Sequence, residues 1–193
     1  MKRYLLLALV VLLALAVLRT ASAQEATIPI TILNPGFEDD VLSCAAGSTC
    51  SSSGSTGWLG AQSNAVKFST VQFPSGIPGG LNVAAIGDSV STGSILQTLG
   101  ITVQAKTKYT LKLSVGARAD YPFTGYNAAL MAGNVTLAHD SSLSPGAGTF
   151  LTDVIVYNAG ETPPQLGQPL QIFIQSKGTG QVAIDNVSLT ATP

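Results

Sequence analysis

The residues able to support acid–base chemistry are few and scattered along the chain. Ten acidic residues accompany a single histidine, His139. Paired carboxylates that meet in space are the machinery of glycoside hydrolysis, and five residues are candidates for it: Glu38, Asp39, Asp40, Asp120 and Asp153. The sequence indicates no aromatic-rich cleft around these carboxylates, and such residues are mostly solvated. Zinc-protease, phosphate-loop and dinucleotide signatures are also missing from the sequence, so the pattern favours a protein that is not an enzyme.

One short segment resembles the nucleophile block of the GDSL-type esterases and lipases. It reads Gly87-Asp88-Ser89 and follows the apolar run Ala84-Ala85-Ile86. In that family a histidine activates the serine, and an aspartate lies two or three residues before the histidine. His139 follows Thr136-Leu137-Ala138 and lacks that aspartate. A serine without a base is a weak nucleophile. We therefore interpret the segment as a tight turn.

The two cysteines predict a local disulfide. Cys44 and Cys50 are too far apart for a C-x-x-C motif, and no second cysteine pair completes a zinc site. A Cys44–Cys50 bond would close a short Ser/Gly-rich loop and contribute about 2 kcal/mol.

The N-terminus predicts export. Lys2 and Arg3 precede an apolar run over 5–18, and Ala21-Ser22-Ala23 supplies a cleavage site after Ala23. The run is shorter than the ~20 residues that cross a bilayer. We expect a signal peptide over 1–23 and a secreted, periplasmic or cell-surface protein without a membrane span. Its net charge of −4, against −1 for the whole chain, argues against nucleic-acid partners.

The pattern beyond residue 24 predicts one all-β domain over 24–193. Short β-branched and aromatic runs alternate with Gly, Pro, Asn and Asp, which is typical of an antiparallel sandwich. In Tyr109-Thr110-Leu111-Lys112-Leu113-Ser114-Val115 the odd positions are expected to face the core. The expected strands cover 27–33, 65–71, 81–86, 94–99, 107–117, 127–132, 135–139, 149–157, 170–176 and 181–190.

A series of motifs resembles the galactose-binding-like jelly rolls, which include several carbohydrate-binding modules. Asn34-Pro35-Gly36-Phe37-Glu38 is similar to the N-x-x-F-E opening of that family, Thr56-Gly57-Trp58 to its GW pair, and Ile184-Asp185-Asn186-Val187-Ser188-Leu189 to its DNV-x-L last strand. The order also resembles a plant cell-wall family known as a domain of unknown function. The resemblance implies a jelly-roll β-sandwich that binds carbohydrate or a cell-wall or matrix polymer.

The resemblance also implies a structural Ca²⁺ held by Glu38 and Asp185. Calcium takes six to eight oxygens, and backbone carbonyls can supplement few carboxylates. The alternative is that Glu38 caps backbone N–H groups and Asp185 shapes a turn.

Aromatic side chains are the candidates for ligand contact, because sugars stack on them. The segment 120–126 concentrates three aromatics, and Trp58 is the single tryptophan. We expect Tyr121, Phe123, Tyr126 and Trp58 to bind ligand, with core packing as the alternative for each. The resulting prediction is a secreted, non-catalytic binding module. A structural or adhesive matrix protein is the second reading, and a GDSL-like esterase is the third.

Overall fold

The protein is described by a computed structural model over residues 25–193, so the predicted signal peptide lies outside the described residues. The regular elements are twelve β-strands: β1 Ile28–Ile30, β2 Cys50–Ser51, β3 Leu59–Ala61, β4 Ser63–Lys67, β5 Val83–Ile86, β6 Ser94–Thr102, β7 Lys108–Ala117, β8 Tyr126–Ala132, β9 Val135–Asp140, β10 Thr149–Asn158, β11 Pro169–Ser176 and β12 Val182–Thr192. None of the described residues lies in a helix that could cross a membrane.

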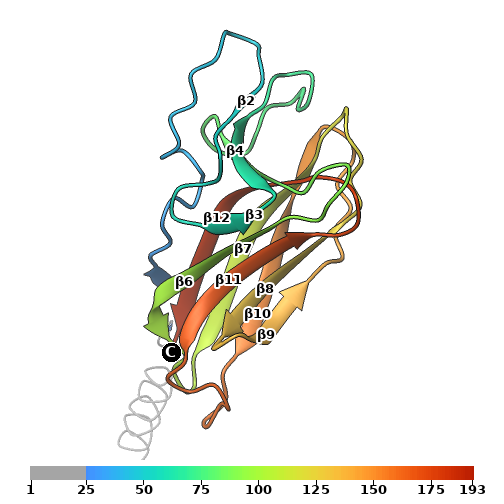
Figure 1. Ribbon diagram of the computed structural model, residues 1–193. Helices are drawn as coiled ribbons and strands as arrows, with labels where there is room; N and C mark the ends of the chain where they lie inside the picture. The colour runs from blue at the N-terminus through green and yellow to red at the C-terminus, as the bar shows by residue number, and fades with distance from the viewer. Residues whose placement is uncertain (1–24) are drawn as a thin grey trace, which may run out of the picture.

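The strands form two sheets that pack face to face (Figure 1). The seven-stranded sheet has the order β10-β7-β12-β5-β4-β2, and β1 pairs with β12 at one end of that strand. The five-stranded sheet has the order β3-β6-β11-β8-β9. The named strand pairs are antiparallel. The predicted antiparallel β-sandwich is confirmed.

The core lies between the sheets and follows the period-two pattern of the sequence. In β7, Tyr109, Leu111, Leu113 and Val115 are at most 1% exposed, whereas Lys112 is exposed. The facing strand β11 contributes Ile172 and Ile174, both fully buried. Each such side chain stabilises the fold by about 1.5–3 kcal/mol relative to an exposed one. Alternation therefore decides which face of each strand turns inward.

A second, smaller cluster covers part of the outer face of the seven-stranded sheet. Phe73, Val83 and Ala183 form it, and Phe68 and Phe150 pack against them. The segment after β4 therefore leaves the sheet at Phe68, although the sequence predicted a strand up to residue 71. The chain leaves the sheet here because the Phe73 ring packs over the outer face of the sheet, against Val83 and Ala183, where it is 1% exposed. A continued strand would have kept Phe73 within the plane of the sheet.

Candidate functional site

The two residues expected to hold a metal are brought together by the ends of the domain. Glu38 follows a turn in which buried Phe37 adopts a φ of 61°. Asp185 lies at a bulge of β12, where the register with β7 shifts between Asp185 and Ser188. Val187 N–H donates to the Pro35 carbonyl at 2.9 Å and fastens this bulge to the turn. Bulges redirect side chains, and here the bulge directs Asp185 toward the turn, with Oδ1 3.7 Å from the Cβ position of Gly36.

Both carboxylates accept backbone N–H groups from the segment before β5. Glu38 Oε1 accepts from Leu81 and Asn82 at 2.8 and 2.7 Å, and Asp185 Oδ2 accepts from Gly79 at 2.9 Å. Gly80 has a φ of 62°, and any Cβ there would collide with the Glu38 carboxylate. The alternative reading of Glu38 as a cap of backbone N–H groups thus describes part of what it does.

The electrostatics of this pair favour a cation. Asp185 is fully buried, and burial raises its pKa to about 6, with the charge of Glu38 adding to the effect. A buried carboxylate beside a second negative charge gains from a positive ion placed between them. Within the described residues, no group of three or more His, Cys, Asp or Glu gathers. Backbone carbonyls would therefore have to supply most of the six to eight oxygens of a calcium site. The two carboxylates would be the charged part of such a set.

The neighbouring acidic residues differ from each other. Asp39 is exposed and its carboxylate has no hydrogen bond in the described structure. Asp40, expected to be solvated, instead accepts from the Thr56 N–H and hydroxyl and from the Asn34 amide. Asp40 thereby joins the turn before Glu38 to the segment that carries Trp58.

Two of the four aromatic residues expected to bind ligand lie in the core. Trp58 is 7% exposed, donates from Nε1 to the Asn34 carbonyl at 3.2 Å and packs on Phe37 with ring centroids 5.6 Å apart. Tyr126 is fully buried. Tyr121 and Phe123 keep part of their surface exposed. The structure therefore makes Tyr121 and Phe123 the reachable members of the set, and their ligand role stays a prediction.

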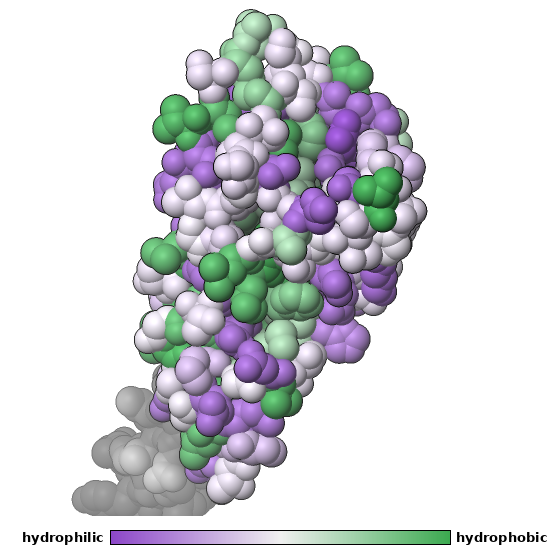
Figure 2. Space-filling view, in the orientation of Figure 1, coloured by the Kyte–Doolittle hydropathy of each residue, from purple (hydrophilic) through white to green (hydrophobic). Residues whose placement is uncertain are grey.

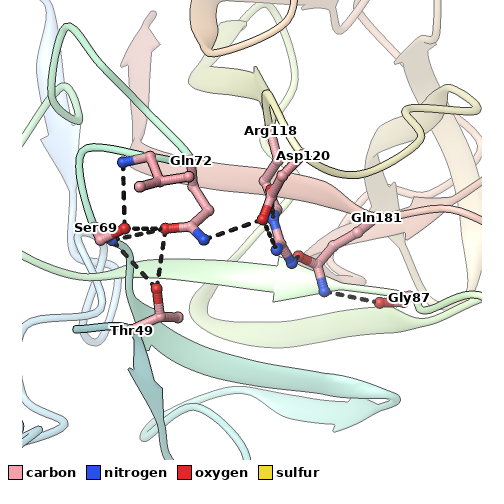
Figure 3. Close-up of polar contacts among 8 residues, drawn as sticks. Thr49, Ser69, Gln72, Gly87, Arg118, Asp120 and Gln181 are labelled. Atoms are coloured by element: carbon pink, nitrogen blue, oxygen red, sulfur yellow. Dashed lines mark hydrogen bonds and ion pairs between the residues drawn. The ribbon is translucent and has the colours of Figure 1, made fainter.

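Arg118, whose guanidinium lies over the Tyr121 ring, belongs to a polar network with Asp120, Gln72 and Gln181 (Figure 3). The Arg118 guanidinium lies 4.9 Å from the ring centroids of both Phe68 and Tyr121. It donates twice to Asp120 at 2.9 Å and once to Gln181 at 2.8 Å. The Arg118 side chain is 17% exposed, so its charge is largely enclosed.

The same network reaches the disulfide. Gln72 donates to Asp120 at 3.0 Å and accepts from the Thr49 hydroxyl at 3.0 Å. Thr49 precedes Cys50, which is bonded to Cys44 as predicted. The disulfide loop is thereby tied to the loop that carries Tyr121.

A buried acidic cluster lies at the β10 edge of the seven-stranded sheet, opposite the β2 edge. Tyr126 Oη donates to Asp153 Oδ2 at 2.7 Å, and Asp153 is 2% exposed. Burial and the nearby charge of Asp140 raise the pKa of Asp153. Burial, together with the hydrogen bond to Asp153 and its charge, raises the pKa of Tyr126 above its ordinary value. Asp153 is one of the scattered carboxylates of the sequence, and no motif there indicates that it meets Tyr126.

An apolar groove of about 630 Å³ opens at the end of the sandwich where β1 and β12 meet β6. Ile28, Ile30, Ile101 and Ala191 give it apolar walls, and Gly100 forms part of its lining. The Tyr109 hydroxyl at its wall already accepts the Gln104 N–H at 2.8 Å. None of the residues that line the groove is acidic. Its volume is in the range of pockets that hold drug-sized ligands.

The outer face of the five-stranded sheet offers a second apolar surface. One row across it pairs Leu59, Leu96, Phe173, Ala129 and His139 in successive strands. Figure 2 shows hydrophobic side chains gathered near the middle of the molecular face, with hydrophilic ones around them. His139 is exposed at the end of this row. The row is flat, so it encloses a ligand less than the groove does.

The Gly87-Asp88-Ser89 segment is the turn that the sequence predicted. Asp88 Oδ1 accepts the N–H groups of Val90 and Ser91, each at 2.8 Å. These bonds lower the pKa of Asp88. Ser89 is exposed and the structure gives it no hydrogen bond to a base.

A comparison with protein families decides the family of the chain. The profile of the HpiC1-like family, described as HpiC1 cyclase, matches residues 28–190, nearly all of the described structure. The chain belongs to the HpiC1 cyclase family. A comparison with curated proteins returned no match.

Solved structures of cyclases agree with membership in the HpiC1 cyclase family. The Stig cyclase Fisc from Fischerella sp. TAU, in complex with (3Z)-3-(1-methyl-2-pyrrolidinylidene)-3H-indole, is 26% identical, with a TM-score of 0.77 over 87% of this chain and 99% of that one. A Fischerella sp. TAU cyclase in complex with 4-(1H-indol-3-yl)butan-2-one is 26% identical, with a TM-score of 0.75 over 86% of this chain and 98% of that one. A family 16 carbohydrate-binding module is 15% identical with a TM-score of 0.53 over 82% of this chain and 97% of that one, which shows a shared fold.

Membership in the HpiC1 cyclase family corrects two predictions. The expectation of a non-catalytic carbohydrate-binding module, and with it the statement that the protein is not an enzyme, is contradicted by the cyclase family and its solved relatives. The resemblance to carbohydrate-binding modules was correct for the fold. The family found is HpiC1 rather than the plant cell-wall family. The motifs that carried the resemblance build the sandwich and its terminal turn, and so report the fold rather than the reaction.

Proposed function

We propose that this protein is a cyclase that closes a ring in an apolar substrate bearing an indole. The observation that carries the proposal is the 26% identity, over most of both chains, with Fischerella cyclases whose structures hold indole compounds. A substrate of that kind needs an apolar surface that removes it from water, and the described residues provide one.

We place the substrate in the groove between β1, β6 and β12. Half of its twelve lining residues are isoleucine, proline or alanine, and the polar atom of Tyr109 is already bonded. Such walls promote ring closure by holding a flexible chain with its reacting ends together. Well-oriented intramolecular reactions gain about 7–11 kcal/mol from this effect.

Calcium is proposed as a structural ion at Glu38 and Asp185. The ion would neutralise the two carboxylates and fasten the turn before Glu38 to the bulge of β12. This turn runs on from β1, which forms one wall of the groove. The ion would therefore help to hold the groove wall in place.

We also propose that the protein works outside the cytoplasm. The Cys44–Cys50 disulfide supports this, because disulfides persist in oxidising compartments. The predicted signal peptide over 1–23 also supports a location outside the cytoplasm.

The test uses Gly100, which lines the groove and has nothing within 4 Å of its Cβ position. A Gly100→Phe side chain should fill the groove without a clash at its base. We expect the wild type to bind 4-(1H-indol-3-yl)butan-2-one in a calorimetric titration. It should also convert an indole carrying an alkenyl chain to a product of equal mass and new retention time. Gly100→Phe should lose both by about tenfold or more.

The matched control is Gly160→Phe. Gly160 is exposed and also has nothing within 4 Å of its Cβ position, but it does not line the groove. This variant should bind and react as the wild type does. If both variants lost binding and ring closure equally, or if neither lost them, the groove would be ruled out as the substrate site. Absence of any ring closure by the wild type across such indoles would contradict the cyclase itself.

A further inference from the structure

Burial of the Asp153 carboxyl group costs free energy at its position in the fold. β10 is an edge strand of the seven-stranded sheet, and Asp153 and Ile155 turn their side chains into the interior, 2% and 3% exposed. A buried carboxyl group loses the hydration that favours its charged form. Neither the proposed groove nor the proposed calcium site uses this residue, so its burial requires a separate explanation.

The contacts of Asp153 reach across the sandwich. Tyr126 belongs to β8 in the five-stranded sheet, and its hydroxyl donates to Asp153 at 2.7 Å. Asp140, the last residue of β9, shares a side-chain hydrogen bond with Asp153. Asp140 is itself held by the N–H groups of Ser141 and Ser142 at 2.6 and 3.0 Å. The three side chains therefore join the edges of the two sheets.

No cation faces this cluster from the described elements around it. On β9, His139 pairs with Ala129 and is exposed. On β7, Lys112 is exposed and its neighbour Leu113 is the residue paired with Asp153. The segment 141–148 contains no ionisable side chain. Among the ionisable side chains of these elements, the Asp153 and Asp140 carboxyl groups therefore contact only each other and the Tyr126 hydroxyl.

We infer that Tyr126, Asp153 and Asp140 form a proton-controlled latch, which holds β10 against β8 and β9 while Asp153 is protonated and releases this edge when Asp153 ionises. A protonated Asp153 donates its O–H to the Asp140 carboxylate and accepts from Tyr126. Loss of that proton to solvent leaves two carboxylates at hydrogen-bonding distance, and like charges repel strongly where water is excluded.

The direction of the response follows from the raised pKa of Asp153. The edge is closed in mild acid and opens as the pH rises from the ordinary aspartate value through that raised pKa. Leu143 and Phe123 pack against the same core cluster as Tyr126. Opening would therefore expose apolar surface beside the aromatic loop 120–126.

Hydrogen–deuterium exchange of the segment 141–150 in the mature protein tests the latch, at pH values from about 5 to 8 and corrected for intrinsic exchange. We expect wild-type protection to fall as the pH rises from the ordinary aspartate value through the raised pKa of Asp153, by at most about tenfold for each pH unit in that interval, and to level off above it. Asp153→Asn keeps an acceptor for Tyr126 without ionising, and its protection should not change with pH. The control Asp39→Asn, an exposed residue, should follow the wild type.

Two outcomes would overturn the inference. One is wild-type protection that does not change with pH, and the other is an Asp153→Asn profile that follows the wild type. Should Asp153→Asn fail to fold, Asp140→Asn serves instead, because it removes the repelling charge and leaves the bond between Tyr126 and Asp153. Asp140→Asn must then stay protected to higher pH than the wild type. An unchanged profile in that variant would also reject the latch.

Discussion

At the scale of single residues, Glu38 and Asp185 do two kinds of work. Their backbone hydrogen bonds fix the segment before β5, and the Glu38 charge adds to the burial that raises the pKa of Asp185. The first kind of work needs only oxygen acceptors, whereas the second leaves a region of negative potential. Substitution by the amides Gln and Asn keeps acceptors and removes charge, so it separates the two.

Calcium should raise the melting temperature of the wild type. Binding only to the folded state stabilises by about 2.7 kcal/mol at a hundredfold excess over Kd, or roughly 5–10 °C for a chain of this size. Glu38→Gln and Asp185→Asn should each abolish the response, and Asp39→Asn should retain it. Thermal unfolding with calcium and with chelator measures the effect. Superimposable wild-type curves would show that no such site exists.

At the scale of elements, the turn after β5 is sensitive to a single methyl group. Gly87 has a φ of 85°, and a Cβ there would collide with the Gly180 carbonyl oxygen and the Ser176 side chain. Gly87→Ala should destabilise the protein by more than the ~1 kcal/mol of an ordinary substitution. Gly100→Ala, in open space on β6, should be close to neutral. Urea unfolding of both variants gives the comparison, and equal midpoints would contradict the role given to this turn.

Strands with a clear apolar alternation were predictable from the sequence, and strands without one were not. β11 alternates along its length, and β7 follows the expected period up to Leu113, after which Ser114, expected on the solvent side, is also buried. β2 and β3 were missed: β2 has two residues, and all three residues of β3, Leu59–Ala61, are exposed. Such strands exist through pairing with β4 and β6, which leaves no trace in local hydrophobicity.

The predictability of the site follows the same rule. The joint position of Glu38 and Asp185 was predictable because their motifs begin and end the sandwich. The meeting of Tyr126 and Asp153 was not, because it depends on how the two sheets stack rather than on any spacing along the chain. The groove also arises only where β1, β6 and β12 end together.

At the scale of the whole molecule, one sandwich fold is shared by a carbohydrate-binding module and by cyclases. Motifs that specify the sandwich therefore carry little information about the reaction. The chain has five aspartates with shifted pKa values, so its stability must depend on pH as a sum over all of them.

The sign of that dependence can be worked out for the calcium-free protein. Asp185, with a pKa of about 6, and Asp153, also raised, hold protons more tightly in the folded state. Their contribution to the free energy of unfolding therefore increases as the pH falls from about 7 toward the ordinary value of 3.8. Asp88, Asp120 and Asp140 have lowered pKa values, and their contribution is lost below 3.8, as the pH falls through those values.

Chemical denaturation in metal-free buffer should therefore show maximal stability in mild acid, at about pH 4–5. Calcium binds the ionised form of Asp185, so it should move this maximum toward neutral pH. Asp185→Asn should flatten the decline between pH 5 and 7 and remove the effect of calcium on the profile. A metal-free wild type that gains stability from pH 5 to pH 8 would contradict the buried, proton-holding state of Asp185 and Asp153. It would mean that both side chains are hydrated enough to ionise at their ordinary pKa.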